Sequence, residues 1–285
     1  MKIEQDWHIH SEHSCDGACL KMEELIIEAE QTGILNYGIS DHLHSSYNMA
    51  DIINSKKNYD AIISKNPALK EIFHFGIEAS CMSEWELDKI RKGDYRGDAT
   101  YGIRQGGPKN AKPAIDIDKG SIEQMGIEYV IGGVHWGLYC DMDRDSILKD
   151  YHRQCMYLIQ HEEIDILAHY LWWNQGAFPD IDNPFADFGN IPQAMKQEMA
   201  FALKQYGCAF ELNLCAVFLA SNLSDRFKRE YLEYVAEMQS MGVILAIGSD
   251  CHNPHYADID FEKSSEMLEK TSIDLSDNIF GISKN

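Results

Sequence analysis

The side chains most able to do chemistry in this sequence are histidines and carboxylates that follow short apolar segments. The first such segment, residues 3–10, ends in His8-Ile9-His10. If it forms a strand, the two-residue period points His8 and His10 to one face, about 6.6 Å apart along it, which suits two ligands of one metal. One His-x-His pair among twelve histidines is weak support, and His42 and His44 form a second pair.

The same arrangement recurs at every predicted strand. The segments at residues 37–40, 72–78, 129–135, 164–169, 209–213 and 243–249 contain or precede side chains that can bind a metal, namely His42, Glu78, His135, His169, Glu211, Asn213, Asp250 and His252. In a closed parallel barrel the carboxyl ends of the strands surround one mouth. We therefore expect a shared metal site of His8, His10, Glu78, His135, His169, Asp250 and His252, with His42 beside them.

The remaining polar residues fall into two groups. Glu211 and Asn213 either orient the metal ligands or contact the substrate, and the sequence leaves both roles open. The other histidines lack the placement at a strand end and are expected on the surface or on helices; they are His13, His44, His74, His152, His161 and His255.

Amphipathic segments alternate with these strands, which predicts parallel strands joined by crossover helices. Apolar residues at helical spacing cover residues 22–30, with Gly33 as a stop, and further helices are expected at about residues 147–159, 191–205, 227–241 and 261–270. A chain of 285 residues suits one barrel, which commonly takes about 250 residues. The sequence thus predicts a single α/β domain over residues 1–285 with seven strands.

Residues 84–119 interrupt this alternation. The segment is rich in glycine and proline, which predicts a long loop of the kind that often covers or binds a substrate. It also gathers basic side chains in an otherwise acidic chain, namely Lys89, Arg91, Lys92, Arg96, Arg104, Lys109 and Lys112. The segment either reaches over an anionic substrate or is a solvated surface excursion.

Composition narrows the classes of partner. The formal charge of −21, from 25 Lys and Arg against 46 Asp and Glu, repels nucleic acid and anionic membranes. We expect some of this negative charge to lie on carboxylates that hold cations. No apolar run approaches the ~20 residues of a membrane span and the start lacks a secretory signal, so we expect a cytoplasmic protein. The eight cysteines form no Cys-x-x-Cys pair, which favours reduced thiols. The oligomeric state stays open, a homo-oligomer included.

The motifs at the strand ends resemble those of the PHP family, named for polymerase and histidinol phosphatase domains, and in particular its histidinol-phosphatase-like branch. The resemblance runs nearly end to end and is carried by Asp6-Trp7-His8-Ile9-His10, Ser11-Glu12-His13-Ser14-Cys15-Asp16-Gly17, Ser40-Asp41-His42, Gly76-Ile77-Glu78, Gly133-Val134-His135, Ala168-His169 and Gly248-Ser249-Asp250-Cys251-His252. It implies a distorted TIM-like (β/α)7 barrel, in agreement with the seven predicted strands. It also implies three divalent metal ions, often zinc, iron or manganese.

Carried over residue by residue, the resemblance implies three metal sites. The first is formed by His8, His10, Glu78 and Asp250; the second by Glu78, His135 and His169; the third by Asp16, His42 and His252. Glu78 bridges the first two, and the catalytic residues are expected to be Glu78, Asp250 and His252. Only the resemblance indicates Asp16, which in the sequence alone is an acid at a helix N-terminus.

Such a cluster has a definite chemistry. Two cations about 3.5–4 Å apart share a water, lower its pKa and present hydroxide to phosphorus while neutralising charge on the phosphate oxygens. The resemblance thus implies a metal-dependent phosphoric monoester hydrolase acting on a small phosphorylated substrate, most like histidinol phosphatase of histidine biosynthesis. Imidazole and carboxylate ligands favour zinc, iron or manganese over calcium. Asp6 and Asp41 are expected to orient ligating imidazoles as hydrogen-bond acceptors.

One departure from the family pattern concerns the phosphate. In histidinol phosphatases a basic residue closely follows the fifth-strand histidine, whereas residues 170–176 after His169 contain no Lys or Arg. Either the metals bind phosphate unaided or a basic residue comes from elsewhere, the candidates being Arg91, Arg96, Arg104 and Arg153. Trp172 and Trp173 either contact a flat substrate portion or pack in the core.

Three other classes of protein compete with the phosphatase. An amidohydrolase-type enzyme also begins with His-x-His at a barrel strand and cleaves a C–N or C–O bond. It is the main alternative, but it predicts a single metal-binding Asp late in the chain, where Asp250 and His252 offer two ligands. The acidic charge disfavours a polymerase-linked nuclease. A metal-storage protein has no need of ligands at a barrel mouth with room for substrate.

Overall fold

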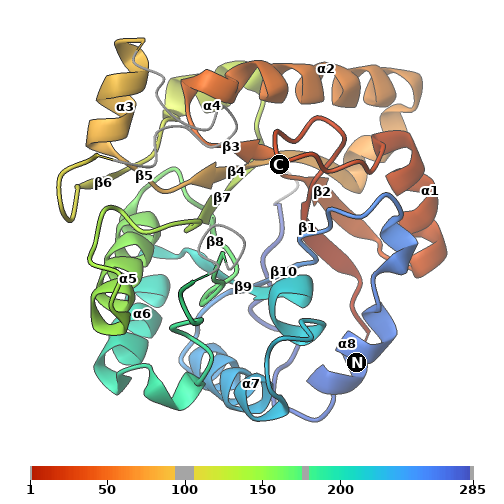
Figure 1. Ribbon diagram of the computed structural model, residues 1–285. Coiled ribbons are helices and arrows are strands. Elements are labelled where there is room, and N and C mark those ends of the chain that lie inside the picture. The colour runs from red at the N-terminus through yellow and green to blue at the C-terminus, as the bar shows by residue number, and fades with distance from the viewer. Residues whose placement is uncertain (1, 94–105, 175–179, 283–285) are drawn as a thin grey trace.

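The computed structural model describes residues 2–93, 106–174 and 180–282. Seven parallel strands form a nearly closed barrel with helices around it (Figure 1). In order around the barrel these strands are β1 (Gln5–Ile9), β2 (Asn36–Ile39), β4 (Phe73–Ser80), β7 (Tyr129–Gly133), β8 (Ile166–Leu167), β9 (Ala209–Asn213) and β10 (Leu245–Gly248). Each of the seven predicted strand segments contains or overlaps one of them, so the predicted TIM-like α/β barrel is confirmed.

The barrel closes between its first and last strands. The Asp250 N–H donates to the carbonyl oxygen of His8 over 2.7 Å, and the His10 N–H donates to that of Cys251 over 3.1 Å. These bonds continue the parallel pairing just beyond the end of β10, where Ile9 bridges to Cys251. The segments that carry His8, His10 and Asp250 are therefore hydrogen-bonded neighbours, although they lie at opposite ends of the sequence.

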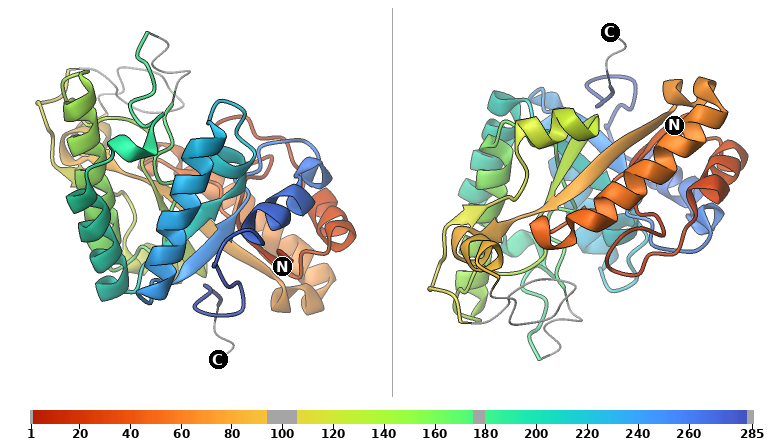
Figure 2. Two further views of the ribbon diagram at one scale, coloured as in Figure 1. Left: turned by 90° about the horizontal axis from the view of Figure 1, so that it is seen from below. Right: turned by 90° about the horizontal axis from the view of Figure 1, so that it is seen from above.

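The outer layer of the barrel is helical (Figure 2). Its α-helices are α1 (Met22–Thr32), α2 (Met49–Lys65), α3 (Glu84–Arg91), α4 (Lys119–Met125), α5 (Arg144–Gln160), α6 (Gln193–Tyr206), α7 (Asp225–Ser240) and α8 (Phe261–Leu268). Short turns complete it: the 3-10 helices η1 (Ser46–Asn48), η2 (Pro67–Glu71), η3 (Phe188–Asn190) and η5 (Tyr256–Asp258), and the π-helix η4 (Leu214–Phe218). None of the described helices has the length and apolar character needed to cross a membrane.

Local sequence explains where the helices begin and end. In α1 the buried residues Met22, Leu25 and Ala29 recur at helical spacing, and Gly33 ends the helix with a left-handed φ of 77°. In α7 the Ser224 side chain accepts a hydrogen bond from the Phe227 N–H and so caps the first turn. The five predicted helices are all present, with ends shifted by up to three residues.

The prediction of one long loop over residues 84–119 is wrong at residues 84–91, 113–114 and 119, which belong to helices or a strand, whereas residues 106–112 and 115–118 belong to neither. Residues 84–91 form α3, whose N-terminus is closed by a capping box between Ser83 and Glu86. Two short strands, β5 (Met82–Ser83) and β6 (Pro113–Ala114), pair in an antiparallel ribbon, and α4 begins at Lys119. Residues 94–105, which include Arg96 and Arg104, lie outside the described residues.

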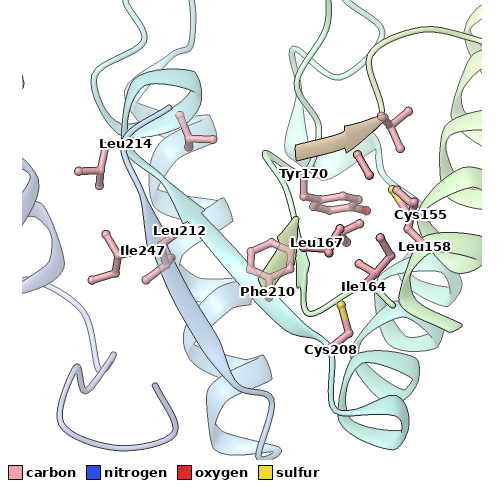
Figure 3. Close-up of a cluster of buried hydrophobic side chains, with 14 of the residues drawn as sticks. Cys155, Leu158, Ile164, Leu167, Tyr170, Cys208, Phe210, Leu212, Leu214 and Ile247 are labelled. Atoms are coloured by element: carbon pink, nitrogen blue, oxygen red, sulfur yellow. The ribbon is translucent and has the colours of Figure 1, made fainter. Parts of the chain in front are cut away.

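The apolar core has two layers. The larger layer lies between the strands and the helices, and Figure 3 shows part of it around Leu167, Phe210 and Cys155. The smaller layer fills the barrel interior and consists of Trp7, Tyr129, Ile131, Ile166, Ala168, Ala209 and Ala246. Phe280 packs edge-on against Trp7 at 5.3 Å and its N–H donates to Leu245 at the start of β10. Apolar packing thus fills the amino-terminal end of the barrel.

Candidate metal centre

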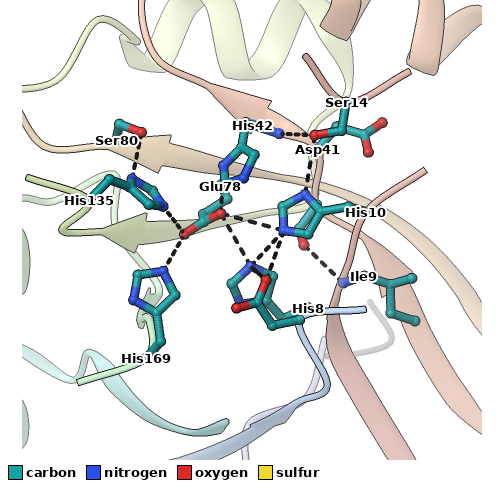
Figure 4. A network of polar contacts seen from close by, with 12 residues as sticks. His8, Ile9, His10, Ser14, Asp41, His42, Glu78, Ser80, His135 and His169 are labelled. Carbon is teal, nitrogen blue, oxygen red and sulfur yellow. Dashed lines mark hydrogen bonds and ion pairs between the residues drawn. The ribbon is translucent and has the colours of Figure 1, made fainter. Parts of the chain in front are cut away.

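Glu78 lies at the centre of a group of imidazoles at the carboxyl ends of the strands (Figure 4). Its side chain is fully buried on β4. Oε1 lies 2.9 Å from His169 Nε2 and 3.1 Å from His135 Nε2. Oε2 lies 2.8 Å from His42 Nδ1 and 3.2 Å from His8 Nε2. The two oxygens of one carboxylate therefore face different sets of nitrogens, as a bridging ligand requires.

Asp250 adds a second carboxylate beside the histidines of β1. Its Oδ1 lies 3.5 Å from His8 Nε2 and 3.2 Å from His10 Nε2. The two Nε2 atoms are 3.0 Å apart, which confirms that His8 and His10 share one face. Asp250 has a φ of 57°, in the left-handed region that an aspartate rarely occupies. Such backbone strain is common at functional sites.

Asp16 brings a third carboxylate from the loop between β1 and α1. Its Oδ2 lies 3.4 Å from His42 Nε2 and 2.5 Å from His252 Nε2. His42 belongs to the two-residue strand β3 (His42–Leu43), which pairs with β4 and places His42 beside Glu78. All nine residues expected to bind metal are therefore brought to one place at the barrel mouth, Asp16 included.

The donor atoms are arranged as a metal site needs. Three sets have ligand atoms within 4.8 Å of one another: His8, His10 and Glu78; His42, Glu78 and His135; and His10, His42 and His252. Glu78 Oε2, His42 Nδ1 and His135 Nε2 are buried and make no hydrogen bond, although they lie close together. Buried polar atoms normally have a partner. Nitrogens and oxygens that converge without hydrogen bonds fit divalent ions between them.

Burial and charge set the protonation of these groups. Burial, followed by the neighbouring histidines, lowers the pKa of His10 to about 3. Burial also lowers the pKa of His135 to about 4, although Glu78 opposes it. Both imidazoles are therefore neutral, as metal ligands must be. Burial disfavours the charged form of Glu78 and Asp250, but the surrounding imidazoles hold the pKa of each carboxyl well below its usual range.

The pKa values of the other histidines of the group are raised, because nearby carboxylates outweigh the effect of burial. Burial alone lowers the pKa of His42, but Glu78 and Asp16 raise it to about 10. The pKa values of His8, His169 and His252 are raised in the same way. Metal ions bound here would take the place of these protons, so binding would release protons.

Glu211 on β9 holds two of the candidate ligand residues in place. One carboxylate oxygen lies 2.6 Å from His8 Nδ1, and the other accepts hydrogen bonds from the His169 N–H and, over 3.1 Å, from Asn213 Nδ2. Since the carboxylate only accepts, His8 Nδ1 donates, so the proton that His8 loses on binding an ion is the one on Nε2, whose lone pair then faces Glu78 and Asp250. Of the two roles left open for Glu211, its contacts favour orientation of the ligands. Asn213 supports it, and also lies 3.4 Å from Asp250 Oδ2.

We expect Glu211→Gln to lower the affinity for zinc by about 10–100-fold, the usual effect of removing a partner that orients a ligand. All the groups that Glu211 contacts are donors, so a glutamine amide must turn its own N–H groups toward one of them. Competition with a chromophoric chelator measures the affinity. Glu233→Gln, an exposed change on α7, is the control and should leave the affinity unchanged. Equal zinc affinity in the Glu211 variant and the parent would contradict this role.

The expectation that Asp6 and Asp41 orient imidazoles is wrong. The Asp41 carboxylate accepts from the Ser11 N–H and hydroxyl and from the Ser55 hydroxyl on α2. Asp6 accepts from the backbone N–H groups of His8 and Ser249 and from the Tyr256 hydroxyl. Both carboxylates hold the backbone around the centre rather than its rings.

Two residues near the centre are unexpected. The Ser80 hydroxyl lies 2.8 Å from His135 Nδ1 and 2.6 Å from His44 Nδ1, so it links the two rings. Ser80 follows Glu78 by two residues on β4, and the strand period is the signal that could have identified it. The expected surface position of His44 is wrong, because its ring is buried and faces the site.

The other histidines lie away from the centre. His74 is buried on β4 between Glu128 and Asn36, each 2.9 Å away, so the expected surface or helical position is wrong for it too. His152 lies on α5, His161 ends that helix, His13 is partly buried in a loop, and His255 is exposed.

A cavity of about 220 Å³ opens beside the centre. It is lined by Asp16, His42, His44, His135, Trp136, His169, Trp172, Asn174, Asp250 and His252. None of these lining residues, all from the described part of the chain, is Lys or Arg. Arg153 donates to the Ala111 carbonyl oxygen and to Asp150, and Arg91 pairs with Asp116, so the two described candidates for a phosphate-binding arginine are engaged elsewhere.

Comparison with models of protein families and with curated protein sequences finds no match. Among solved structures, histidinol phosphate phosphatase from Lactococcus lactis subsp. lactis, complexed with zinc, L-histidinol and phosphate, matches with a TM-score of 0.58 at 13% identity, over 94% of this chain and 93% of that chain. Ochratoxinase from A. niger matches with a TM-score of 0.39 at 15% identity, over 95% and 68% of the two chains. At this identity the similarity to the phosphatase establishes a shared fold.

Proposed function

We propose that the protein is a metal-dependent hydrolase of small phosphate monoesters, and that the nine residues of the candidate centre bind three divalent ions. The observation that carries this proposal is the position of Glu78, whose two oxygens face four imidazoles within 3.2 Å. The resemblance to the PHP family supports it, as does the fold shared with a phosphatase that was complexed with zinc and phosphate. Histidinol phosphate, and with it a place in histidine biosynthesis, is the substrate that the resemblance favours.

The proposed ligand sets follow the contacts. His8, His10, Glu78 and Asp250 hold the first ion; Glu78, His135 and His169 hold the second; Asp16, His42 and His252 hold the third. Imidazole and carboxylate ligands suit zinc, iron or manganese. Bound there, the ions lower the pKa of a water and neutralise charge on the phosphate oxygens.

Side chains around the centre position the metal-binding rings and line the cavity beside them. Glu211 fixes the ring of His8, and Ser80 fixes that of His135. Asp250 and His252 line the cavity, so we assign them contact with the ester as well as with an ion. The described lining contains no Lys or Arg, so among the described groups the bound ions would supply the positive charge that attracts the phosphate group.

We expect untagged protein to release phosphate from p-nitrophenyl phosphate, histidinol phosphate or both, and expect chelation to lower that rate at least about 100-fold. Readdition of manganese or zinc should restore it. Colorimetric phosphate release measures both steps. Metal-loaded protein that releases no phosphate from either compound would contradict the proposal and favour an amidohydrolase-type enzyme that cleaves a C–N or C–O bond.

A further inference from the structure

His169 reaches the candidate centre although the strand before it would direct this position elsewhere. The side chains of this segment alternate, because Ile166 and Ala168 belong to the barrel interior and Leu167 belongs to the outer layer of the core. The two-residue period of a strand would therefore point residue 169 toward the surrounding helices. Instead the His169 ring faces Glu78, with 2.9 Å between Nε2 and Oε1 (Figure 4). The backbone must turn at His169 to bring the ring there.

The turn contains two residues with left-handed backbone conformations. His169 has a φ of 24° and Leu171 has a φ of 70°. Residues other than glycine rarely adopt such values, and they keep them only where the surrounding structure holds them in place. The change of direction at His169 is thus a strained conformation that needs support from neighbouring groups.

Hydrogen bonds from three sides support this turn. The hydroxyl of Tyr151, on α5, accepts from the Leu171 N–H over 2.9 Å and donates to the His169 carbonyl oxygen over 3.4 Å. The Trp172 N–H donates to the same carbonyl oxygen over 2.9 Å, and the Glu211 carboxylate accepts from the His169 N–H. The phenol of Tyr151 is buried, and its oxygen contacts the backbone of both left-handed residues.

The same helix also supports the backbone beside His135. Gln154, which lies three residues after Tyr151 on α5, is fully buried, and its side-chain amide donates to the Trp136 carbonyl oxygen over 3.0 Å. Trp136 directly follows His135. The inward face of α5 therefore holds the backbone next to His135 and His169, the two imidazoles assigned to the second metal ion.

We propose that Tyr151 is a positioning residue for the second metal ion, because its hydroxyl holds the strained turn that directs the His169 ring toward Glu78. The inference rests on the metal centre of the proposed function and adds a residue that acts on one of the three ions through the backbone. Without the hydroxyl, residues 169–171 relax toward ordinary φ values, and the ring moves away from Glu78.

Tyr151→Phe tests this role, since it removes the hydroxyl and keeps the aromatic ring. Zinc titration of metal-free protein in competition with a chromophoric chelator measures the affinity for each ion. We expect two ions to bind with parental affinity and one to bind about 10-fold more weakly. This is the lower end of the usual effect of losing a partner that orients a ligand, because Tyr151 acts through the backbone.

Tyr234→Phe is the matched control. Tyr234 is a buried residue of α7 whose hydroxyl donates to the Lys196 carbonyl oxygen of α6 over 2.8 Å. Its loss should leave all zinc affinities parental. A second comparison uses His169→Ala, in which the ring that Tyr151 positions is absent. Adding Tyr151→Phe to that protein should leave the affinities of the remaining ions unchanged.

Three results would overturn the inference. They are parental zinc affinities in Tyr151→Phe, an equal loss of affinity for all three ions, and a further loss when Tyr151→Phe is added to His169→Ala. The last two would indicate a general structural defect. A parent protein that binds no zinc at all would instead overturn the proposed metal centre and this inference together, so the two failures are distinguishable.

Discussion

Glu78→Gln is expected to reduce phosphatase turnover at least about 1000-fold and to lower the metal content of the purified protein. Loss of a partner that only orients a ligand typically costs 10–100-fold, and Glu78 is proposed to contact two ions directly. Glutamine keeps the shape of the side chain but loses its charge and one of its accepting oxygens. The histidines around it then face no bridging carboxylate. Steady-state phosphate release and elemental analysis of the same samples measure the two effects.

Glu198→Gln is the matched control for this change. Glu198 is exposed on α6 and pairs with His152 over 2.9 Å, a surface ion pair that contributes little to stability. The control should keep full turnover and metal content, and circular dichroism should show the parent fold in both variants. Parental turnover and metal content in the Glu78→Gln protein would show that Glu78 is not a metal ligand of the centre.

Gly133→Ala is expected to reduce turnover about 100-fold or more without removing any proposed ligand. A Cβ atom at Gly133, the last residue of β7, lies 2.3 Å from Glu78 Oε1 and 2.7 Å from His135 Cε1. Neither a buried carboxylate nor a buried ring can stay that close to a Cβ atom, so Glu78 and His135 must both move away from it. A shift of about 1 Å at a reacting centre can cost 100-fold in rate.

Thermal and urea unfolding separate this effect from a general loss of structure. Overpacking at a buried site typically costs about 1–3 kcal/mol in free energy of unfolding, which leaves most domains folded. Gly281→Ala is the control, because a Cβ atom there meets nothing within 4 Å. Parental turnover in a folded Gly133→Ala protein would show that the gap beside Glu78 is not needed.

The sequence predicts the barrel well because its strands are short apolar runs that end in polar residues. It misses α2, a helix of 17 residues whose buried positions include Ser55 and Tyr59 beside Ile52 and Ile62. A stripe that mixes polar and apolar residues does not show the helical period clearly. The Ser55 hydroxyl is buried because Asp41 accepts its hydrogen bond, and that tertiary contact cannot be seen in the local sequence.

The segment at residues 84–119 shows a conflict between two local signals. Its glycines and prolines favour a loop, whereas Ser83 and Glu86 have the three-residue spacing of a capping box. The capping signal is decisive for residues 84–91, where Leu87 and Ile90 are also buried. The capping-box residues Ser83 and Glu86 are thus the local signal for the start of α3.

The candidate centre is predictable where ligands follow strands and less so elsewhere. His8, Glu78 and His135 are identified by their positions at strand ends, which converge in any parallel barrel. Asp16 lies in a loop, and only the resemblance to a family predicts its position beside His42 and His252. The choice of Glu211 over Asp6 and Asp41 as the partner of an imidazole depends on which strands face each other across the barrel, and local sequence does not contain that information.

Metal content measured by elemental analysis on untagged protein is the most direct test of the central claim, that nine residues spread along the chain form one metal centre. Cells grown with added zinc, iron and manganese provide the material, and the measurement needs no assumption about the substrate. The account predicts close to three divalent ions per chain. Less than one ion per chain would contradict it.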